Sequence, residues 1–173
     1  MSARAFVWLL CFALAPQMAQ AWWNADYKQR TKITLNTSAA GVETKEALSG
    51  AVVPVRLHSG NFDFAAAKPD GSDIRVIAGD DKTPLKFALR RFDSGSELGV
   101  IWVQLPTVAP ATDKKNTFYV YAGNPGAPAE QPAQVFDPAT LAVFHFDDPS
   151  GMPRDAVGQS GPATGSMVTA AGM

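Results

Sequence analysis

Apolar and polar side chains alternate along residues 32–36, 53–58, 74–76 and 85–90. This period of two is typical of strands with one buried and one exposed face. Residues 100–103 are apolar throughout, which predicts a central strand covered on both sides. Residues 117–122 are rich in aromatic and β-branched side chains, which favour strands. We therefore expect six strands and no amphipathic helix, with one helical turn at most at 62–68.

Turn-forming residues separate these runs, with clusters of Pro, Asp, Gly and Ser at 69–73, 79–82 and 93–96. Six short strands joined by such turns within about a hundred residues predict an all-β fold, an antiparallel, jelly-roll-like β-sandwich. Pro54 lacks a backbone N–H, so its strand is expected at a sheet edge or to begin late.

The composition changes after Gly123. Seven of the fourteen glycines and seven of the thirteen prolines fall between this residue and the end of the sequence. Residues 127–138 are therefore expected to be a linker, and 140–146 another strand. One strand cannot bury its own apolar face. Residues 139–173 are thus either the start of an incomplete second β module, which we favour, or a disordered tail.

The first 21 residues have the three parts of a secretory signal. Arg4 precedes an apolar run over 5–15, Pro16 interrupts it, and Ala19 and Ala21 form the small-x-small cleavage pattern. The run is shorter than the ~20 residues that a transmembrane helix needs. We expect cleavage after Ala21 and an exported protein, located in the periplasm or on the periplasmic side of the inner membrane. The mature domain itself is not expected to span the membrane.

Cleavage also removes the only cysteine, Cys11, which follows Leu10 and so does not fit a lipoprotein signal. The mature chain can then form no disulfide and no thiolate metal site. Losing Arg4 turns fifteen basic and sixteen acidic residues into fourteen and sixteen, a formal charge of −2. A charge this close to zero gives no reason to expect nucleic acid as a partner.

A set of short segments forms a combined pattern that begins with Trp22-Trp23 and Tyr27 to Thr34, and continues with 53–57, 62–64, 70–75, 84–85, 100–106 and 119–124. Together these segments resemble the family of domains called DUF2341, over about residues 22–126. Ala122 stands where that family more often has a second aromatic residue. The resemblance implies that the motif residues are structural, namely Asp70, Gly71, Asp73, Trp102, Gly123 and Asn124.

A second resemblance concerns residues 143–158, which look like the first strand of a LamG or concanavalin A-like jelly-roll. Such modules often follow a DUF2341 domain. In many proteobacterial members the same polypeptide continues into a MotA/TolQ/ExbB-type proton-channel segment. The resemblance therefore implies a periplasmic arm of such a channel as one role for the chain.

No catalytic constellation is visible in the sequence. His58 and His145 lack partners at metal-ligand spacing, and no serine lies in a GxSxG elbow. The carboxylates fall in or near predicted turns, where Asp caps backbone N–H groups. Asp70 to Asp73 could offer oxygens to Ca²⁺, but we favour a turn before Ile74. We expect neither enzymatic activity nor a cofactor. The carboxylates weighed as acid and base are Asp63, Asp70, Asp73, Asp80, Asp81, Asp93 and Glu97.

Aromatic residues form the candidate ligand surface, namely Trp22, Trp23, Tyr119 and Tyr121. The two tyrosines share one face of their strand, and an exposed pair could stack on sugar rings. Trp102 is expected in the core. We expect a non-catalytic recognition module that binds a cell-envelope glycan or a periplasmic or inner-membrane protein, such as a TolQ/ExbB-type channel. The alternatives are an accessory domain of a glycan-cleaving enzyme whose catalytic residues lie downstream, and a structural spacer.

Overall fold

The computed structural model describes residues 22–111, 116–129, 134–146 and 153–158. The residues expected to form the signal peptide lie outside this range, as does most of the expected second module. Within the described residues all regular structure is strand, and no helix is long and apolar enough to cross a membrane. The strands are β1 (Gln29–Thr34), β2 (Leu48–His58), β3 (Arg75–Ala78), β4 (Phe87–Asp93), β5 (Leu98–Val108) and β6 (Thr117–Ala122).

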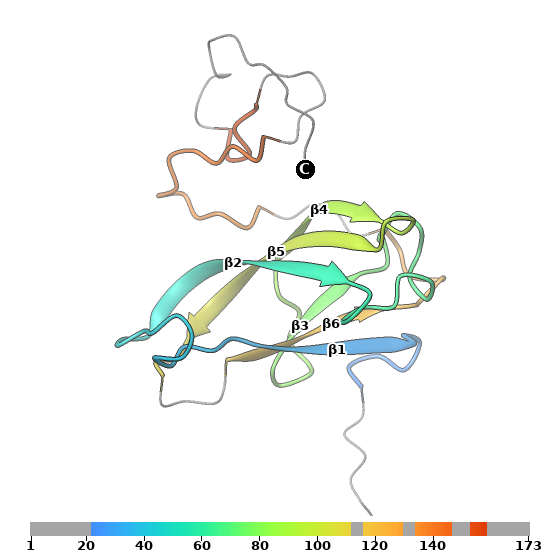
Figure 1. Cartoon of the computed structure of the whole chain (residues 1–173), viewed down its shortest axis with the longest axis horizontal. Coiled ribbons are helices and arrows are strands. Elements are labelled where there is room, and N and C mark those ends of the chain that lie inside the picture. The colour runs from blue at the N-terminus through green and yellow to red at the C-terminus, as the bar shows by residue number, and fades with distance from the viewer. Residues whose placement is uncertain (1–21, 112–115, 130–133, 147–152, 159–173) are drawn as a thin grey trace, which may run out of the picture.

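Two antiparallel sheets of three strands face each other (Figure 1). Sheet A has the order β1-β6-β3, and sheet B has the order β2-β5-β4. The predicted all-β, antiparallel sandwich is confirmed. The turns expected at 69–73, 79–82 and 93–96 lie between β2 and β3, between β3 and β4, and between β4 and β5.

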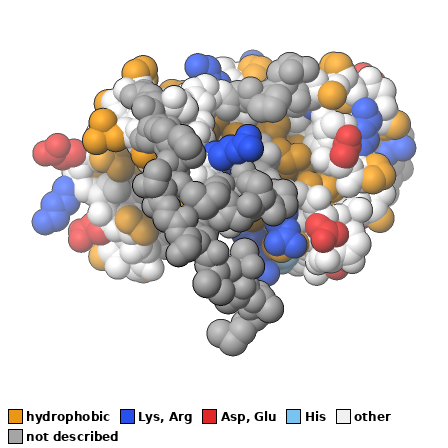
Figure 2. Space-filling model, turned by 90° about the horizontal axis from the view of Figure 1, so that it is seen from above, with side chains coloured by type: hydrophobic (Ala, Val, Ile, Leu, Met, Phe, Trp, Pro, Cys, Tyr) orange, Lys and Arg blue, Asp and Glu red, His pale blue; other side chains and the backbone are white. Residues whose placement is uncertain are grey.

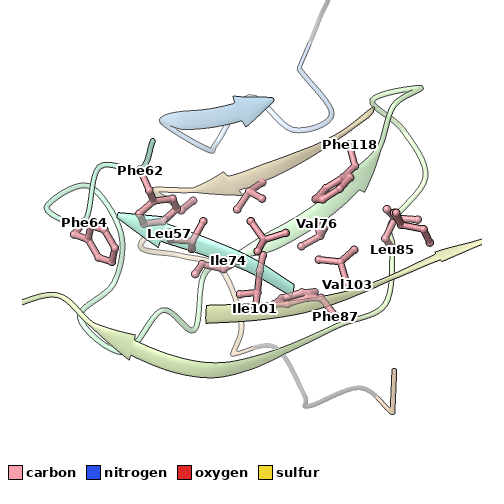
Figure 3. Close-up of a cluster of buried hydrophobic side chains, with 14 of the residues drawn as sticks. Leu57, Phe62, Phe64, Ile74, Val76, Leu85, Phe87, Ile101, Val103 and Phe118 are labelled. Carbon is pink, nitrogen blue, oxygen red and sulfur yellow. The ribbon is translucent and has the colours of Figure 1, made fainter. Parts of the chain in front are cut away.

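The core fills the space between the sheets, as Figure 3 shows. Alternation along β5 turns Ile101 and Val103 inward, and on β6 it turns Phe118 and Val120 inward. All four side chains are fully buried. Phe62 and Phe64, from the loop after β2, close one end of the core with rings 5.0 Å apart. Burial of these side chains is the main stabilising contribution to the fold.

Two strand predictions can be compared directly with the structure. β5 is the central strand of sheet B, as its apolar sequence predicts. Pro54 lies inside β2 opposite Trp102, and β2 is an edge strand. The expectation of an edge strand is therefore confirmed. The missing N–H of Pro54 costs no hydrogen bond on the side of β2 where no strand pairs with it. The strand does not begin late, because pairing extends back to Leu48.

The prediction of a strand at 140–146 is wrong. This segment forms only an isolated bridge between Phe144 and Asp155. The residues expected to be a linker also differ from the prediction where they are described. Ala127 and Val135 are buried, and the Lys68 ammonium donates a 2.7 Å hydrogen bond to the Ala127 carbonyl. Scattered apolar residues among glycine and proline thus anchor this segment to the sandwich.

Candidate functional site

The motif residues around Asp73 tie two distant segments together. The buried Asp73 carboxylate accepts hydrogen bonds from the backbone N–H groups of Lys68 (3.0 Å), Gly123 (2.7 Å) and Asn124 (3.0 Å). These bonds join the loop before β3 to the end of β6. A buried carboxylate is stable here because backbone donors surround it. The structural role implied for Asp73, Gly123 and Asn124 agrees with these contacts.

Gly71 and Gly123 adopt left-handed backbone angles, with φ of +69° and +87°. A Cβ at residue 71 would approach the Phe92 ring to 2.8 Å, so only glycine fits there. The Asp70 carboxylate accepts the Ser72 N–H at 3.0 Å, and hydrogen bonding from Ser72 lowers the pKa of Asp70. With Asp70 and Asp73 both bonded to backbone donors, the segment has the contacts of a turn, which the sequence favours over a Ca²⁺ site.

The four residues of the candidate ligand surface lie together on the outer face of sheet A. With Tyr27 they form a group that we call the aromatic cluster: Trp22, Trp23, Tyr27, Tyr119 and Tyr121. Around the Tyr121 ring, the centroids of Trp22, Trp23 and Tyr27 each lie 5.8 Å away in edge-to-face geometry. The expectation that Tyr119 and Tyr121 form an exposed stacking platform is wrong, because they are only 7% and 0% exposed. They do point away from the core, but the N-terminal segment folds back over them.

An ion pair lies at the centre of the aromatic cluster. The Arg30 guanidinium binds the Asp81 carboxylate, and its carbon lies 4.7 Å from the Tyr119 ring centre and 5.3 Å from that of Trp22. The Tyr121 hydroxyl donates to Asp81 at 2.5 Å and accepts the Trp23 N–H at 3.0 Å. Each polar atom in these contacts has a partner within the chain.

Titration of two groups reflects these contacts. Burial and the hydrogen bond to Asp81 raise the pKa of Tyr121. Desolvation acts to lower the pKa of Arg30, but hydrogen bonding to Tyr121 and the charge of Asp81 outweigh it, so the pKa of Arg30 is raised. Of the four predicted surface residues, Trp22 is exposed, at 37%, Trp23 is half-buried, and the two tyrosines are buried. The aromatic cluster is therefore a second, smaller core.

Trp102 is not in the main core, contrary to the sequence prediction. Its neighbours Ile101 and Val103 occupy the inward positions of β5, so alternation turns Trp102 to the outer face of sheet B. There its ring centre lies 5.9 Å from that of Phe136 and 5.6 Å from that of His145. Figure 1 shows this later segment of the chain above β4 and β5. Both faces of β5 are thus covered at this point.

An open hollow of about 610 Å³ lies beside Trp102. We call it the arginine groove, and its lining residues are Arg90, Arg91, Val100, Trp102, His145 and Phe146. Arg90 and Arg91 are exposed, and Phe146 is 70% exposed. Figure 2, which views this side of the molecule, shows Lys and Arg side chains beside hydrophobic ones. The groove combines apolar ring faces with two cations and has a typical ligand-pocket volume.

A second hollow of about 380 Å³ is lined by two of the carboxylates weighed as an acid and a base, Asp63 and Glu97. The Asp63 carboxylate accepts the N–H groups of Ala65 (3.0 Å) and Ala66 (3.3 Å), so it closes a turn. Both bonds are to the Asp63 Oδ1 atom and are typical of a turn aspartate. In the described part of the chain no three His, Cys, Asp or Glu side chains are grouped to hold a metal ion.

The site residues expected from the sequence do not include Arg30, Arg90 or Arg91. Asp81 resembles the other turn aspartates in the sequence, because its partner Arg30 is 51 residues away. For Arg90 and Arg91 a signal was present: two adjacent arginines between Leu89 and Phe92 interrupt the alternation of β4. The structure has a β-bulge at this point, because the pairing with β5 shifts between Leu89 and Arg91.

Comparisons with known proteins give one finding. No curated protein and no solved structure matches the chain. A family model described as "Domain of unknown function (DUF2341)" matches residues 70–158. This range includes the motif residues from Asp70 to Asn124 and runs on through the segment that covers Trp102. β1 and β2 lie before it, although they belong to the same sandwich. The match covers half of the sequence, and the chain belongs to the DUF2341 family.

Proposed function

We propose that this chain is a non-catalytic recognition module of the cell envelope that binds a glycan in the arginine groove. The observation that carries the proposal is the combination of Trp102, Phe146 and two exposed arginines around one open hollow of about 610 Å³. Sugars present apolar C–H faces that stack on aromatic rings, and hydroxyl groups that accept hydrogen bonds from guanidinium groups. A groove that offers both kinds of contact suits a saccharide better than a flat apolar protein surface.

The rigid framework around the groove supports the same proposal. Val100 and Trp102 lie on the central strand of sheet B, and their backbone is fixed by neighbours on both sides. A binding residue on a central strand is held more precisely than one on a loop. His145 and Phe136 pack against the Trp102 ring and limit its rotation. The stacking surface is therefore preorganised, which lowers the entropic cost of binding.

The envelope setting of this proposal rests on the signal-like residues 1–21 and on the family resemblance. In its fuller form the module is the periplasmic arm of a TolQ/ExbB-type proton channel, with a LamG-like module following it. Fractionation of native cells and an immunoblot test this setting. A much larger band in the inner-membrane fraction is expected. A band slightly below 18.4 kDa in the soluble periplasm contradicts the channel arm but not glycan binding.

Binding is tested by calorimetric titration of the protein with isolated wall polysaccharide. Saturable binding is expected, weakened at least about tenfold by Trp102→Ala. Stacking of a nucleic-acid base on an aromatic ring contributes about 1–3 kcal/mol, and we expect a similar contribution from a sugar ring. Trp102→Phe keeps an aromatic face and should retain most of the affinity. Trp22→Ala, in the aromatic cluster, is the matched control and should bind normally.

Two results would contradict the proposal: no binding by the unaltered protein, or unchanged binding by Trp102→Ala. Release of new reducing ends from the polysaccharide would instead support the glycan-cleaving alternative. Circular dichroism of each variant confirms that the sandwich is retained.

A further inference from the structure

Trp102 is shared by two hollows on the outer face of sheet B. It lines the arginine groove and also a smaller hollow of about 250 Å³, together with Arg90 and His145 in both cases. The strand register gives the order of the two hollows. Ala88, which lines the smaller hollow but not the groove, pairs with Trp102, whereas Val100, in the groove, lies two residues earlier on β5. Two residues along a strand span about 7 Å, so the hollows follow one another along β5.

The arginine groove itself contains two aromatic rings from distant parts of the chain. Trp102 lies on the central strand of sheet B, and Phe146, which is 70% exposed, comes from the segment above it. One aromatic ring stacks on one sugar ring, so a single sugar would leave one of the two rings without a ligand contact. The groove volume of about 610 Å³ also suits a ligand of the size of a disaccharide better than a single sugar.

Neither hollow is lined by buried residues alone. Arg91 and Phe146 are exposed in the arginine groove, and Gln134 is exposed in the smaller hollow. A site that recognises the end of a chain needs a wall against which that end stops. Exposed residues in both hollows leave room for a polymer that enters through one hollow, passes Trp102 and continues through the other.

We infer that the site binds an internal stretch of a linear polysaccharide, laid along β5, rather than a terminal sugar. Consecutive sugars stack on Phe146 and Trp102, and the next one occupies the smaller hollow. Each added sugar makes new contacts without a second loss of translational and rotational freedom, so affinity rises with chain length. This inference rests on the proposed function and names the ligand class for the same site.

Fragments of graded length test the inference. Partial hydrolysis of the wall polysaccharide gives single sugars, disaccharides and longer oligosaccharides, and each is titrated calorimetrically against the protein. Affinity is expected to rise at least about tenfold from the single sugar to the disaccharide, and again when the fragment is long enough to reach the smaller hollow. Equal affinity for single sugars and for oligosaccharides overturns the inference.

Substitution of Phe146 separates the two stacking positions. Phe146→Ala should weaken the binding of oligosaccharides at least about fivefold and leave that of the single sugar nearly unchanged, because the single sugar stacks on Trp102. The matched control, Leu141→Ala, removes an 80% exposed apolar side chain of the same segment that lines neither hollow, and it should bind every fragment normally. The inference is overturned if Phe146→Ala changes nothing, if it weakens all fragments by one factor, or if Leu141→Ala has the same effect.

The number of protein molecules on one long polysaccharide chain gives an independent test. An internal site lets more molecules bind than the chain has ends, whereas a site for a terminal sugar does not. Light scattering from saturated complexes measures this ratio, and more molecules than chain ends are expected. A ratio limited to the ends overturns the inference, while the binding itself still supports the proposed function. Absence of binding to the wall polysaccharide overturns both.

Discussion

The two outer faces of the sandwich use the same ingredients differently. On sheet A, Arg30 lies against the rings of Trp22 and Tyr119 and is neutralised by Asp81. On sheet B, Arg91 lies beside Trp102 around an open groove whose described lining has no carboxylate. An arginine next to aromatic rings is therefore not by itself a binding site. What distinguishes the faces is burial: the N-terminal segment covers the tyrosine rings of sheet A, whereas Arg91 and Phe146 stay exposed around the hollow on sheet B.

This difference predicts separate consequences for substitutions on the two faces. Changes in the aromatic cluster should lower the free energy of unfolding and leave glycan affinity intact. Changes in the arginine groove should lower affinity and leave stability nearly intact. Urea unfolding of variants on each face measures their free energies of unfolding and so tests this division.

Asp81→Ala should have the largest effect on stability. It leaves Arg30 without its ion pair and the buried Tyr121 hydroxyl without its acceptor. It also places alanine at a left-handed backbone angle, φ +56°. Together these changes should destabilise the fold by about 3–4 kcal/mol. Asp81→Asn tolerates the backbone angle and keeps an acceptor, so it should cost clearly less. Equal losses in the two variants would show that the backbone angle and the retained acceptor are unimportant here, and that the lost charge accounts for the effect.

The same substitution made on each face gives the sharpest comparison. Arg30→Gln leaves the buried Asp81 charge without its cation and should cost about 2 kcal/mol, since Tyr121 remains as a donor. Arg91→Gln removes an exposed charge and should change stability by less than about 0.5 kcal/mol. Similar losses for both variants would mean that Arg91 also has a structural partner, and would weaken the division between the faces.

Among the changes in the aromatic cluster, Tyr121→Phe should have the smallest effect near neutral pH, about 1 kcal/mol, because it removes one hydrogen-bonding hydroxyl and keeps the ring. Its effect on alkaline stability is more specific. The raised pKa of Tyr121 in the folded state contributes stability that is fully present below the unfolded value, near 10, and is lost as the pH rises through the folded value. Unfolding is measured between about pH 9 and 12, in steps of about one pH unit around the unfolded pKa. The free energy of unfolding should fall over this range, and the fall should be smaller in Tyr121→Phe. A variant with the same alkaline profile would mean that another group titrates.

Much of the fold could be predicted from local patterns. Alternation along β6 correctly places Phe118 and Val120 on one face and the tyrosines on the other. The burial of Tyr121 could not be predicted, because Trp23 covers it from 98 residues away. Local patterns report the direction of a side chain within its strand, and long-range packing decides what covers it.

The candidate site was less predictable for the same reason. The apolar run around Trp102 was interpreted as core, although alternation alone turns Trp102 away from Ile101 and Val103. Asp81 resembles any other turn aspartate until the fold brings Arg30 next to it. Arg90 and Arg91 become a pair on one face only through the bulge, whose register is set by pairing with β5.

The strand order of sheet A has a consequence for the time course of folding. β1 and β3 do not pair with each other. Each of them pairs with β6, whose last residue is Ala122, so neither can pair until β6 has been synthesised. A growing chain can therefore form the β4–β5 hairpin and the β2–β5 pairing of sheet B while sheet A still has no hydrogen-bonded pair of strands. Closing pairs this far apart in sequence is slow. The sandwich is thus completed only after synthesis has passed its final strand, and until then the edges of β1 and β3 stay unpaired.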